Sequence, residues 1–538
     1  MCVAFSVAVA YPEVSHTRWR TLFARWMDGV EEGWAIPLLL LGFVAIWQAY
    51  FAIAYAGGDL HPDVLETWTL GRSLEWGYSK HPPLMGWIAR AWTTIFPLTN
   101  WSFDLLSLTN SALALWTTDL ITRRFVRGDK RLIALLLLML LPTYQFHAQR
   151  FNANAVLLAT WPLATYCFLR SFETRSLEWA IAAGASAALV MLGKYFSVFL
   201  IASFAVAAIC HRERRAYFGS VSPWVSTLVG LLVLAPHIYW LATTGAKPFA
   251  YALTRHCGKA LVPSLGEAIG FLLCAGLVVL LPAAAWVLMA GERMKKFCDD
   301  FHAMNTGLLL LFMISLGTVF FPAITSIVMG TDMPPIWSLQ GLFLFLILLV
   351  CGASYQIERV RALNLAAGVI AFSVCVACIV APIHALYRNF YPLGEGRNFY
   401  QAAADELTRR WHAVTDLPLP AIGGDEDLAF ATAFYSPDHP LYEEELLAGN
   451  SWRLREVIGY ESGWAGLCFG ADANCVAAME TIAARAPRVI RYEFELQSTL
   501  MGQPGATERF TAVIVAPALE SSQRVAASGA DSVIATIP

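Results

Sequence analysis

Charged residues are scarce in this chain of 538 residues. Asp, Glu, Lys and Arg together make up 14% of it, whereas a soluble protein carries about 25%. Apolar residues make up 57%, and long apolar runs recur from Trp34 to Ile383. Since runs of about 18 or more such residues are typical of transmembrane helices, the composition excludes a large soluble protein and predicts an α-helical polytopic membrane protein.

Three further absences narrow the class of protein. The first residues, "MCVAFSVAVAYPE", lack the basic segment that begins a signal peptide, so residues 1–33 are interpreted as a cytoplasmic N-terminal arm. The net charge of −3 provides no positive excess for a nucleic-acid partner, and we expect none. No internal repeat is visible in the sequence.

The apolar runs predict about eleven spans within a membrane domain at 34–386, with a first outer loop at 57–101. The spans are 34–56, 102–122, 132–146, 155–169, 179–193, 196–210, 221–241, 266–290, 305–322, 337–353 and 363–383. Those between 132 and 210 are short for a bilayer, so their exact number stays open.

Lys and Arg gather in the connections on one side of these spans. With the N-terminus in the cytoplasm, the inner segments hold 18 of them, and the outer connections before the C-terminal tail hold eight. Basic loops stay in the cytoplasm. We therefore expect a bacterial inner-membrane protein with a cytoplasmic N-terminus and, after an odd number of spans, a periplasmic C-terminal domain.

The composition changes after Leu386, where residues 387–538 predict a soluble α/β domain. In "RVIRYEFELQ" apolar and polar residues alternate, which is typical of a half-buried strand. Cys468 and Cys475 stand apart from the cysteines of the apolar spans. Their spacing is unlike a paired CxxC zinc site, and an oxidising periplasm favours a disulfide between them. Zinc binding and two free thiols are the alternatives.

Polar and ionisable residues of the membrane domain gather at the outer ends of the spans. Such residues are costly at membrane depth, which makes them functional candidates by default. Basic groups there can hold a lipid phosphate, and a carboxylate can accept a proton from a hydroxyl. The outer set comprises Asp59, His61, Asp63, Glu66, Lys80, His81, Arg150, Asn152, Asn154, Lys194, Tyr195, Lys247, Arg255, His256 and Asp332.

The tryptophans of the first outer loop allow two interpretations. An interfacial aromatic belt, on helices that lie along the membrane, is favoured for any one of them. Stacking against sugar rings is the alternative. The four residues are Trp68, Trp76, Trp87 and Trp92.

The order of residues in this loop is also specific. It reads "DVLETW…WGYSKHPPLMGW" from Asp63 to Trp87, which resembles the first outer loop of bacterial PMT-type glycosyltransferases. That membrane family belongs to the GT-C class and includes protein mannosyltransferases and the aminoarabinose lipid A transferase. Later segments resemble the family too, so the resemblance covers most of the chain. They are "RSFETRSLEWAIAAGASAALVMLGKYFSVFL", "APHIYWLATTGAKPFAYALTRH" and "GGDEDLAFATAFYSPDHP".

The resemblance implies a GT-C fold and transfer of a sugar from a polyprenyl-phosphate carrier at the outer side of the membrane. The family's essential acid lies in the first outer loop, and Asp63 falls on its position. Members often have Asp-Glu here, whereas Val64 follows Asp63 and the next acid is Glu66. Asn152 and Asn154 lie where many members have a second Asp. No cofactor is therefore firmly expected, and a divalent metal ion is the open alternative.

The candidate site residues follow from position, charge and this resemblance. Asp63 is the expected catalytic base, and Glu66 is the second catalytic candidate. The plain alternatives are an N-cap role for Asp63 and a snorkelling side chain for Lys194. The donor-phosphate candidates are Lys194, Arg255, Lys80, His81 and Arg150, and the substrate-binding candidates are Asp59, Trp68, Tyr78, Asn154, Tyr195 and His256.

We therefore expect an inverting glycosyltransferase that moves a hexose or a uronic acid from a polyprenyl-phosphate donor. The expected acceptor is lipid- or glycan-linked: lipid A, lipopolysaccharide core or another cell-envelope glycan. A transporter or flippase is the alternative, although its site would lie near mid-membrane between repeated halves. A sensor would need a cytoplasmic output domain, and every inner loop is short. Besides donor and acceptor, the expected partners are membrane lipids.

Reporter fusions test the orientation. Because the predicted C-terminus is periplasmic, alkaline phosphatase fused after Pro538 is expected to be active. A cytoplasmic reporter fused at the same point is expected to be inactive. The reverse pattern would overturn the orientation and, with it, the assignment of the first outer loop to the outer face.

Overall fold

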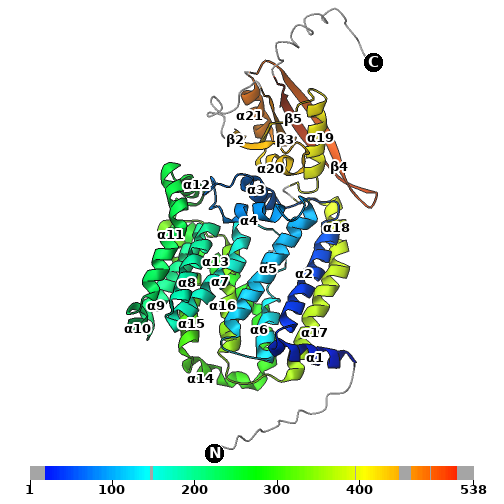
Figure 1. The fold of residues 1–538 in the computed structure, drawn as a ribbon. Helices are drawn as coiled ribbons and strands as arrows, with labels where there is room; N and C mark the ends of the chain where they lie inside the picture. The colour runs from blue at the N-terminus through cyan, green and yellow to red at the C-terminus, as the bar shows by residue number, and fades with distance from the viewer. Residues whose placement is uncertain (1–17, 146–149, 394–395, 448–461, 485, 518–538) are drawn as a thin grey trace, which may run out of the picture.

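The computed structural model describes residues 18–145, 150–393, 396–447, 462–484 and 486–517. A bundle of helices carries a small α/β domain on one end (Figure 1). This arrangement confirms the predicted fold class, a helical membrane protein with a C-terminal domain that contains a sheet.

The described chain up to Phe390 forms no strand and is mostly helical. The first helix, α1 (Arg18–Glu32), lies across the end of the bundle opposite the α/β domain (Figure 1). The remaining α-helices are α2 (Ala35–Ala54), α3 (Pro62–Gly71), α4 (Leu84–Thr93), α5 (Asn100–Thr122), α6 (Asp129–Leu138), α7 (Ala153–Thr174), α8 (Leu177–Gly193), α9 (Val198–Cys210), α10 (Arg214–Phe218), α11 (Ser222–Thr243), α12 (Lys247–His256), α13 (Leu261–Ala290), α14 (Phe297–His302), α15 (Thr306–Met329), α16 (Leu342–Cys351), α17 (Arg359–Cys375) and α18 (Ala381–Phe390). Short 3-10 or π turns are η2 (Tyr195–Ser197), η3 (Gly291–Lys296), η4 (Pro335–Gly341) and η5 (Val376–Val380).

Within the described residues, six helices are long and apolar enough to cross a membrane. They are α2, α7, α11, α13, α15 and the continuous helix Arg359–Phe390, and each coincides with a predicted span. Three shorter apolar helices, at 177–193, 195–210 and 335–351, also fall on predicted spans.

The predicted span 132–146 differs from the structure. Helix α6 ends at Leu138, and its ten residues rise only about 15 Å, about half of a hydrocarbon core. Every residue from Leu132 to Leu138 is buried inside the bundle. The leucine run therefore reflects burial on all sides, which a sequence cannot distinguish from contact with lipid.

The C-terminal domain holds a five-stranded sheet in the order β2-β1-β3-β5-β4. Strand β1 is parallel to β2 and β3, whereas β5 is antiparallel to β3 and β4. The alternating segment falls in β4, as predicted, with half-buried residues at every second position. The elements are α19 (Tyr400–His412), β1 (Ala421–Gly424), α20 (Glu426–Tyr435), β2 (Leu441–Leu447), β3 (Trp464–Phe469), α21 (Ala473–Ala483), β4 (Val489–Leu500) and β5 (Gln503–Val515).

The α/β domain docks on residues 57–101, the predicted first outer loop, through a shared apolar core. Helix α20 packs against α3, and Phe434 lies edge-on to Trp68 with ring centroids 5.3 Å apart. Phe103 of α5 contacts the same phenyl ring at 5.5 Å. Trp68, expected to bind substrate, is only 9% exposed, so its indole is used to hold two domains together.

Hydrogen bonds reinforce this docking. The Arg72 guanidinium donates to the backbone carbonyls of His439 and Pro440, both at 2.8 Å. The hydroxyl of Tyr435 accepts from the backbone N–H of Leu60 at 2.9 Å. The contacts anchor α3 at both ends, so the geometry of the outer loop depends on the C-terminal domain.

The Sγ atoms of Cys468 on β3 and Cys475 on α21 are bonded as a disulfide. Peptide mapping without reductant is expected to yield the linked pair, and reduction should release two alkylatable peptides. Since the bond closes a short loop, replacing both cysteines by serine is expected to cost about 2 kcal/mol of domain stability, measured by denaturant unfolding. Recovery of both residues alkylated without reductant would rule the bridge out.

Candidate active site at the junction of the two domains

Helix α3 begins with a proline, and its N-cap is His61. The Nδ1 atom of His61 accepts a hydrogen bond from the backbone N–H of Asp63 at 3.1 Å. Asp63 is therefore not the cap, which removes the plain alternative considered for it. Its carboxylate lies in the first turn, where the positive end of the helix dipole favours a negative charge.

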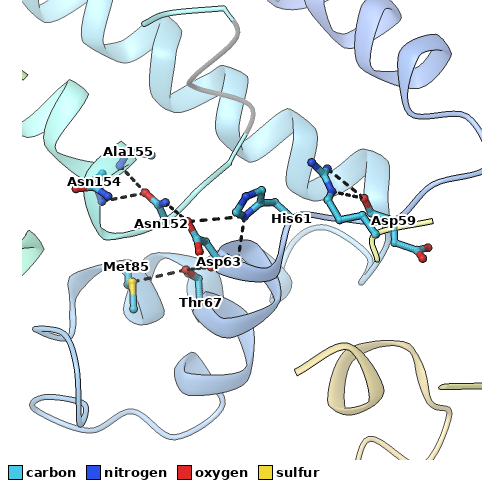
Figure 2. Close-up of polar contacts among 9 residues, drawn as sticks. Asp59, His61, Asp63, Thr67, Met85, Asn152, Asn154 and Ala155 are labelled. Carbon is cyan, nitrogen blue, oxygen red and sulfur yellow. Dashed lines mark hydrogen bonds and ion pairs between the residues drawn. The ribbon is translucent and has the colours of Figure 1, made fainter. Parts of the chain in front are cut away.

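The Asp63 carboxylate is oriented by an amide and stays accessible. Asn152 donates from Nδ2 to Asp63 Oδ2 at 2.7 Å, and the Nδ1 atom of His61 lies 3.7 Å from the same oxygen. The Oδ1 atom of Asn152 accepts from the backbone N–H groups of Asn154 and Ala155, both at 2.9 Å, and so caps α7 (Figure 2). The Asp63 side chain remains 40% exposed, so a substrate can reach it.

Lys194 joins this group from the junction of α8 and η2. Its Nζ donates to Asn154 Oδ1 at 2.6 Å and lies 3.8 Å from the ring centroid of Trp337, a cation–π distance. Gln340 donates to the backbone carbonyl of Asn154 at 3.2 Å. Segment η4 therefore forms a wall of the site, and neither Trp337 nor Gln340 was marked by any motif along the chain.

Lys80 lies between two acids from different domains. Its Nζ is 3.5 Å from Glu66 Oε1 on α3 and forms an ion pair with Glu426 on α20. Burial raises the pKa of Glu66 to about 7, against the charge of Lys80. Burial also disfavours the Lys80 cation, but the two carboxylates outweigh this and raise the pKa of Lys80. Lys80 is thus a cation whose charge is already neutralised.

His81 lies within electrostatic reach of the same groups. Burial, together with the positive charges of Lys194 and Lys80, lowers the pKa of His81 to about 3, and Asp63 opposes this shift. At neutral pH the ring is therefore uncharged. A neutral His81 can donate or accept hydrogen bonds, so its role as a phosphate ligand stays a prediction that does not depend on a positive charge.

Asp59 belongs to the domain junction rather than to this cluster. Its Oδ2 accepts from the backbone N–H of Gln401 at 3.0 Å, and its backbone carbonyl accepts two hydrogen bonds from Arg397 at 3.2 and 3.1 Å. Its side chain lies on the far side of His61 from Asp63 (Figure 2). Burial raises the pKa of Asp59 to about 7, although backbone hydrogen bonds lower it. Asp59 also lines a pocket of about 590 Å³ together with Arg397 and Tyr435, so its role as a substrate ligand stays a prediction.

Two other substrate-binding candidates are held by contacts of their own. The hydroxyl of Tyr78, which is buried, donates to a carbonyl within its own loop at 3.2 Å. The hydroxyl of Tyr195 pairs with His237 Nε2 at 3.0 Å, and the two rings stack. Neither contact brings a tyrosine to the Asp63 carboxylate.

The remaining basic candidates differ in how they are placed. Arg150 lies two residues before Asn152, and its Nε is buried without a hydrogen-bond partner in the described parts of the chain. An unpartnered buried donor is costly, so Arg150 stays a candidate for binding a phosphate. The side chains of Arg255 and His256, at the end of α12, lie outside the described part of the structure.

The C-terminal domain contributes acids that were not selected from the sequence. Asp425 caps α20, its Oδ1 accepting from the backbone N–H of Leu428 at 3.0 Å, and Glu426 and Asp427 follow. Burial and the neighbouring acids raise the pKa of Asp427 to about 7. The three consecutive acids in "GGDEDLAF" were the sequence feature that could have marked these residues as site candidates. Over the described ranges, no group of three or more His, Cys, Asp and Glu could hold a metal ion.

Comparison with known protein sequences finds one matching family and two similar glycosyltransferases. The sequence profile of the dolichyl-phosphate-mannose-protein mannosyltransferase family matches residues 80–240. The lipopolysaccharide core galacturonosyltransferase RgtB of Rhizobium johnstonii is 28% identical over 39% of this chain. The lipid A galacturonosyltransferase RgtD of the same organism is 24% identical over 38% of this chain. Each match spans 42% of the relative's own length.

Solved structures resemble a larger part of the chain. The apo structure of ArnT from Cupriavidus metallidurans aligns with 91% of this chain and all of its own, with a TM-score of 0.58 at 14% identity. The structure of that protein bound to undecaprenyl phosphate aligns with 90% and 99%, with a TM-score of 0.53 at 13% identity. These findings confirm the predicted resemblance: the chain is similar to bacterial membrane glycosyltransferases of the PMT type, and it has the GT-C fold of ArnT.

Proposed function

We propose that this protein is an inverting glycosyltransferase that uses a polyprenyl-phosphate sugar at the outer face of the bacterial inner membrane. The observation that carries the proposal is the accessible Asp63 carboxylate, held by Asn152 at 2.7 Å within electrostatic reach of Lys194. Burial lowers the pKa of Lys194 to about 7, and Asp63 opposes this shift, so a phosphate bound beside Lys194 would favour its charged form. A base and phosphate-binding cations in one cluster are the two elements that such a transfer needs.

The proposed reaction is a single displacement. The acceptor hydroxyl oxygen attacks the anomeric carbon, and its proton passes to the Asp63 carboxylate. The bond between the anomeric carbon and the phosphate oxygen breaks, and the polyprenyl phosphate leaves with both electrons. One displacement inverts the configuration at that carbon.

The cations act on the leaving group. Negative charge grows on the phosphate as the bond breaks, and positioned cations stabilise it. Lys194, Lys80 and Arg150 are the candidates whose side chains the structure describes, and Arg255 is a further one. Because Lys80 is paired with Glu66 and Glu426, the phosphate must compete with two carboxylates for it. Glu66, whose pKa is raised to about 7, can become neutral at little cost and so weaken that competition.

The relatives favour a galacturonic acid donor and a lipid A or lipopolysaccharide core acceptor. Both curated relatives are named as galacturonosyltransferases, one acting on each of these acceptors. Mass spectrometry of lipid A and core from a deletion strain tests this part of the proposal. Loss of one hexuronic acid residue, restored by the intact gene, is the expected result, whereas unchanged glycans would exclude this acceptor class.

The general-base role predicts the effect of Asp63→Asn. Asparagine keeps the size of the side chain but cannot accept the proton, so turnover should fall by about a hundredfold or more. Sugar transfer from a polyprenyl-phosphate donor is measured with purified enzyme. Expression should stay normal, and donor binding should fall much less than turnover, since no basic side chain is replaced and Asp63 only modulates the charge of Lys194. Turnover near the parental rate would remove Asp63 from the reaction, and Glu66→Gln would be the next variant.

Substitutions of Asn152 separate its two contacts. Asn152→Ala removes the α7 N-cap and the hydrogen bond to Asp63, so it should lower stability by about 1 kcal/mol and also lower turnover. Asn152→Ser can still cap the helix but is too short to hold Asp63. It should keep the parental melting temperature and lose turnover. Full turnover in the serine variant would show that Asp63 needs no support from this amide.

A further inference from the structure

A basic pocket of about 380 Å³ lies at the end of the bundle opposite the candidate active site. Its wall includes Arg123, Arg124, Arg127, Arg131 and Arg170, which come from the connection between α5 and α6 and from α6 and α7. Five guanidinium groups in one concavity repel one another unless anions offset their charge.

Internal acids offset three of these arginines. Arg131 makes a bidentate contact with Asp119 at 2.6 and 2.5 Å. Arg124 and Arg170 share Glu173, each at 3.0 Å. These three side chains are therefore fixed in place and shape the pocket.

Two arginines are left with unused charge. In the part of the chain that the structure describes, Arg123 and Arg127 form no ion pair and no side-chain hydrogen bond, and both are exposed. Glu31 is the third acid at the pocket, where it accepts from the backbone N–H of Gly128 at 2.5 Å. Against three acids, the five arginines leave a surplus of two positive charges.

Aromatic side chains beside the pocket favour a position at the level of lipid headgroups. Tyr166 lines it and packs edge-on against Trp179 at 5.4 Å, and the Arg170 guanidinium lies 5.3 Å from the Trp179 ring. Tyr and Trp prefer the membrane–water interface. Helix α1, which carries Glu31, lies across this end of the bundle (Figure 1).

We propose that this pocket binds the phosphate of an anionic phospholipid, with Arg123 and Arg127 as its ligands. A phosphodiester is negatively charged and so offsets the surplus positive charge of the arginines. Its oxygens also match the planar N–H donors of a guanidinium group. Basic pockets between helices at this depth suit such headgroups. A zwitterionic lipid brings an ammonium group that the remaining arginines repel. The site is independent of the sugar-transfer reaction proposed above.

Lipid binding by the purified full-length protein tests the proposal. Native mass spectrometry in detergent measures retention of added phosphatidylglycerol and phosphatidylcholine. The protein should retain phosphatidylglycerol selectively, and Arg123→Gln/Arg127→Gln should bind it about tenfold more weakly or worse. The matched control is Arg212→Gln/Arg215→Gln, which removes two exposed arginines from another inner segment and should bind as the parent does.

Three results would overturn the proposal. Equal weakening in both double variants would show that general surface charge holds the lipid. Retention of phosphatidylcholine equal to that of phosphatidylglycerol would show that the net charge of the lipid does not determine binding. A third arm adds inorganic phosphate as competitor: displacement of the lipid at equal concentration would identify the site as one for a free anion.

Discussion

The packing of Phe434 against Trp68 is the contact that joins the α/β domain to the helical bundle. It places α20 on α3, so that a helix from the soluble domain and a helix from the first outer loop share one apolar core. A buried aromatic pair of this kind contributes about 0.5–1.5 kcal/mol of stability beyond that of the apolar area that it buries. Because the helices are held face to face, Glu426 reaches Lys80 and completes the charged cluster around Asp63.

Desolvation explains how that cluster is arranged. A buried charge is stable only with a partner, and here Lys80 has two while His81 loses its charge altogether. Asp63 differs, since it keeps one strong hydrogen bond and an exposed face. A carboxylate that is oriented but not neutralised can accept a proton, whereas one locked in an ion pair is a weaker base.

The two ends of the bundle use arginine and lysine in different ways. At the end that carries the α/β domain, Lys80 is balanced by acids from both domains, so an anionic ligand would have to compete for it. At the opposite end, the arginines around the basic pocket outnumber the acids, so an anion can bind without displacing a carboxylate. The first arrangement suits a ligand that enters and leaves in each turnover. The second suits a lipid that stays bound.

Local pattern determined much of this protein. Long apolar runs predicted most helices of the bundle, and alternating residues predicted β4. The loop from Asp63 to Trp87 carried the family resemblance. Each of these features depends on residues that are close together in the chain. The tertiary structure decided what each polar or aromatic residue does. Trp68 and Asp59 both contact the α/β domain and join it to the bundle, and Lys80 meets Glu426 across 346 residues. Such pairings form only when segments distant in the sequence pack together and exclude water. The same burial shifts the pKa of His81 and of Glu66. A local sequence pattern contains no information about either effect.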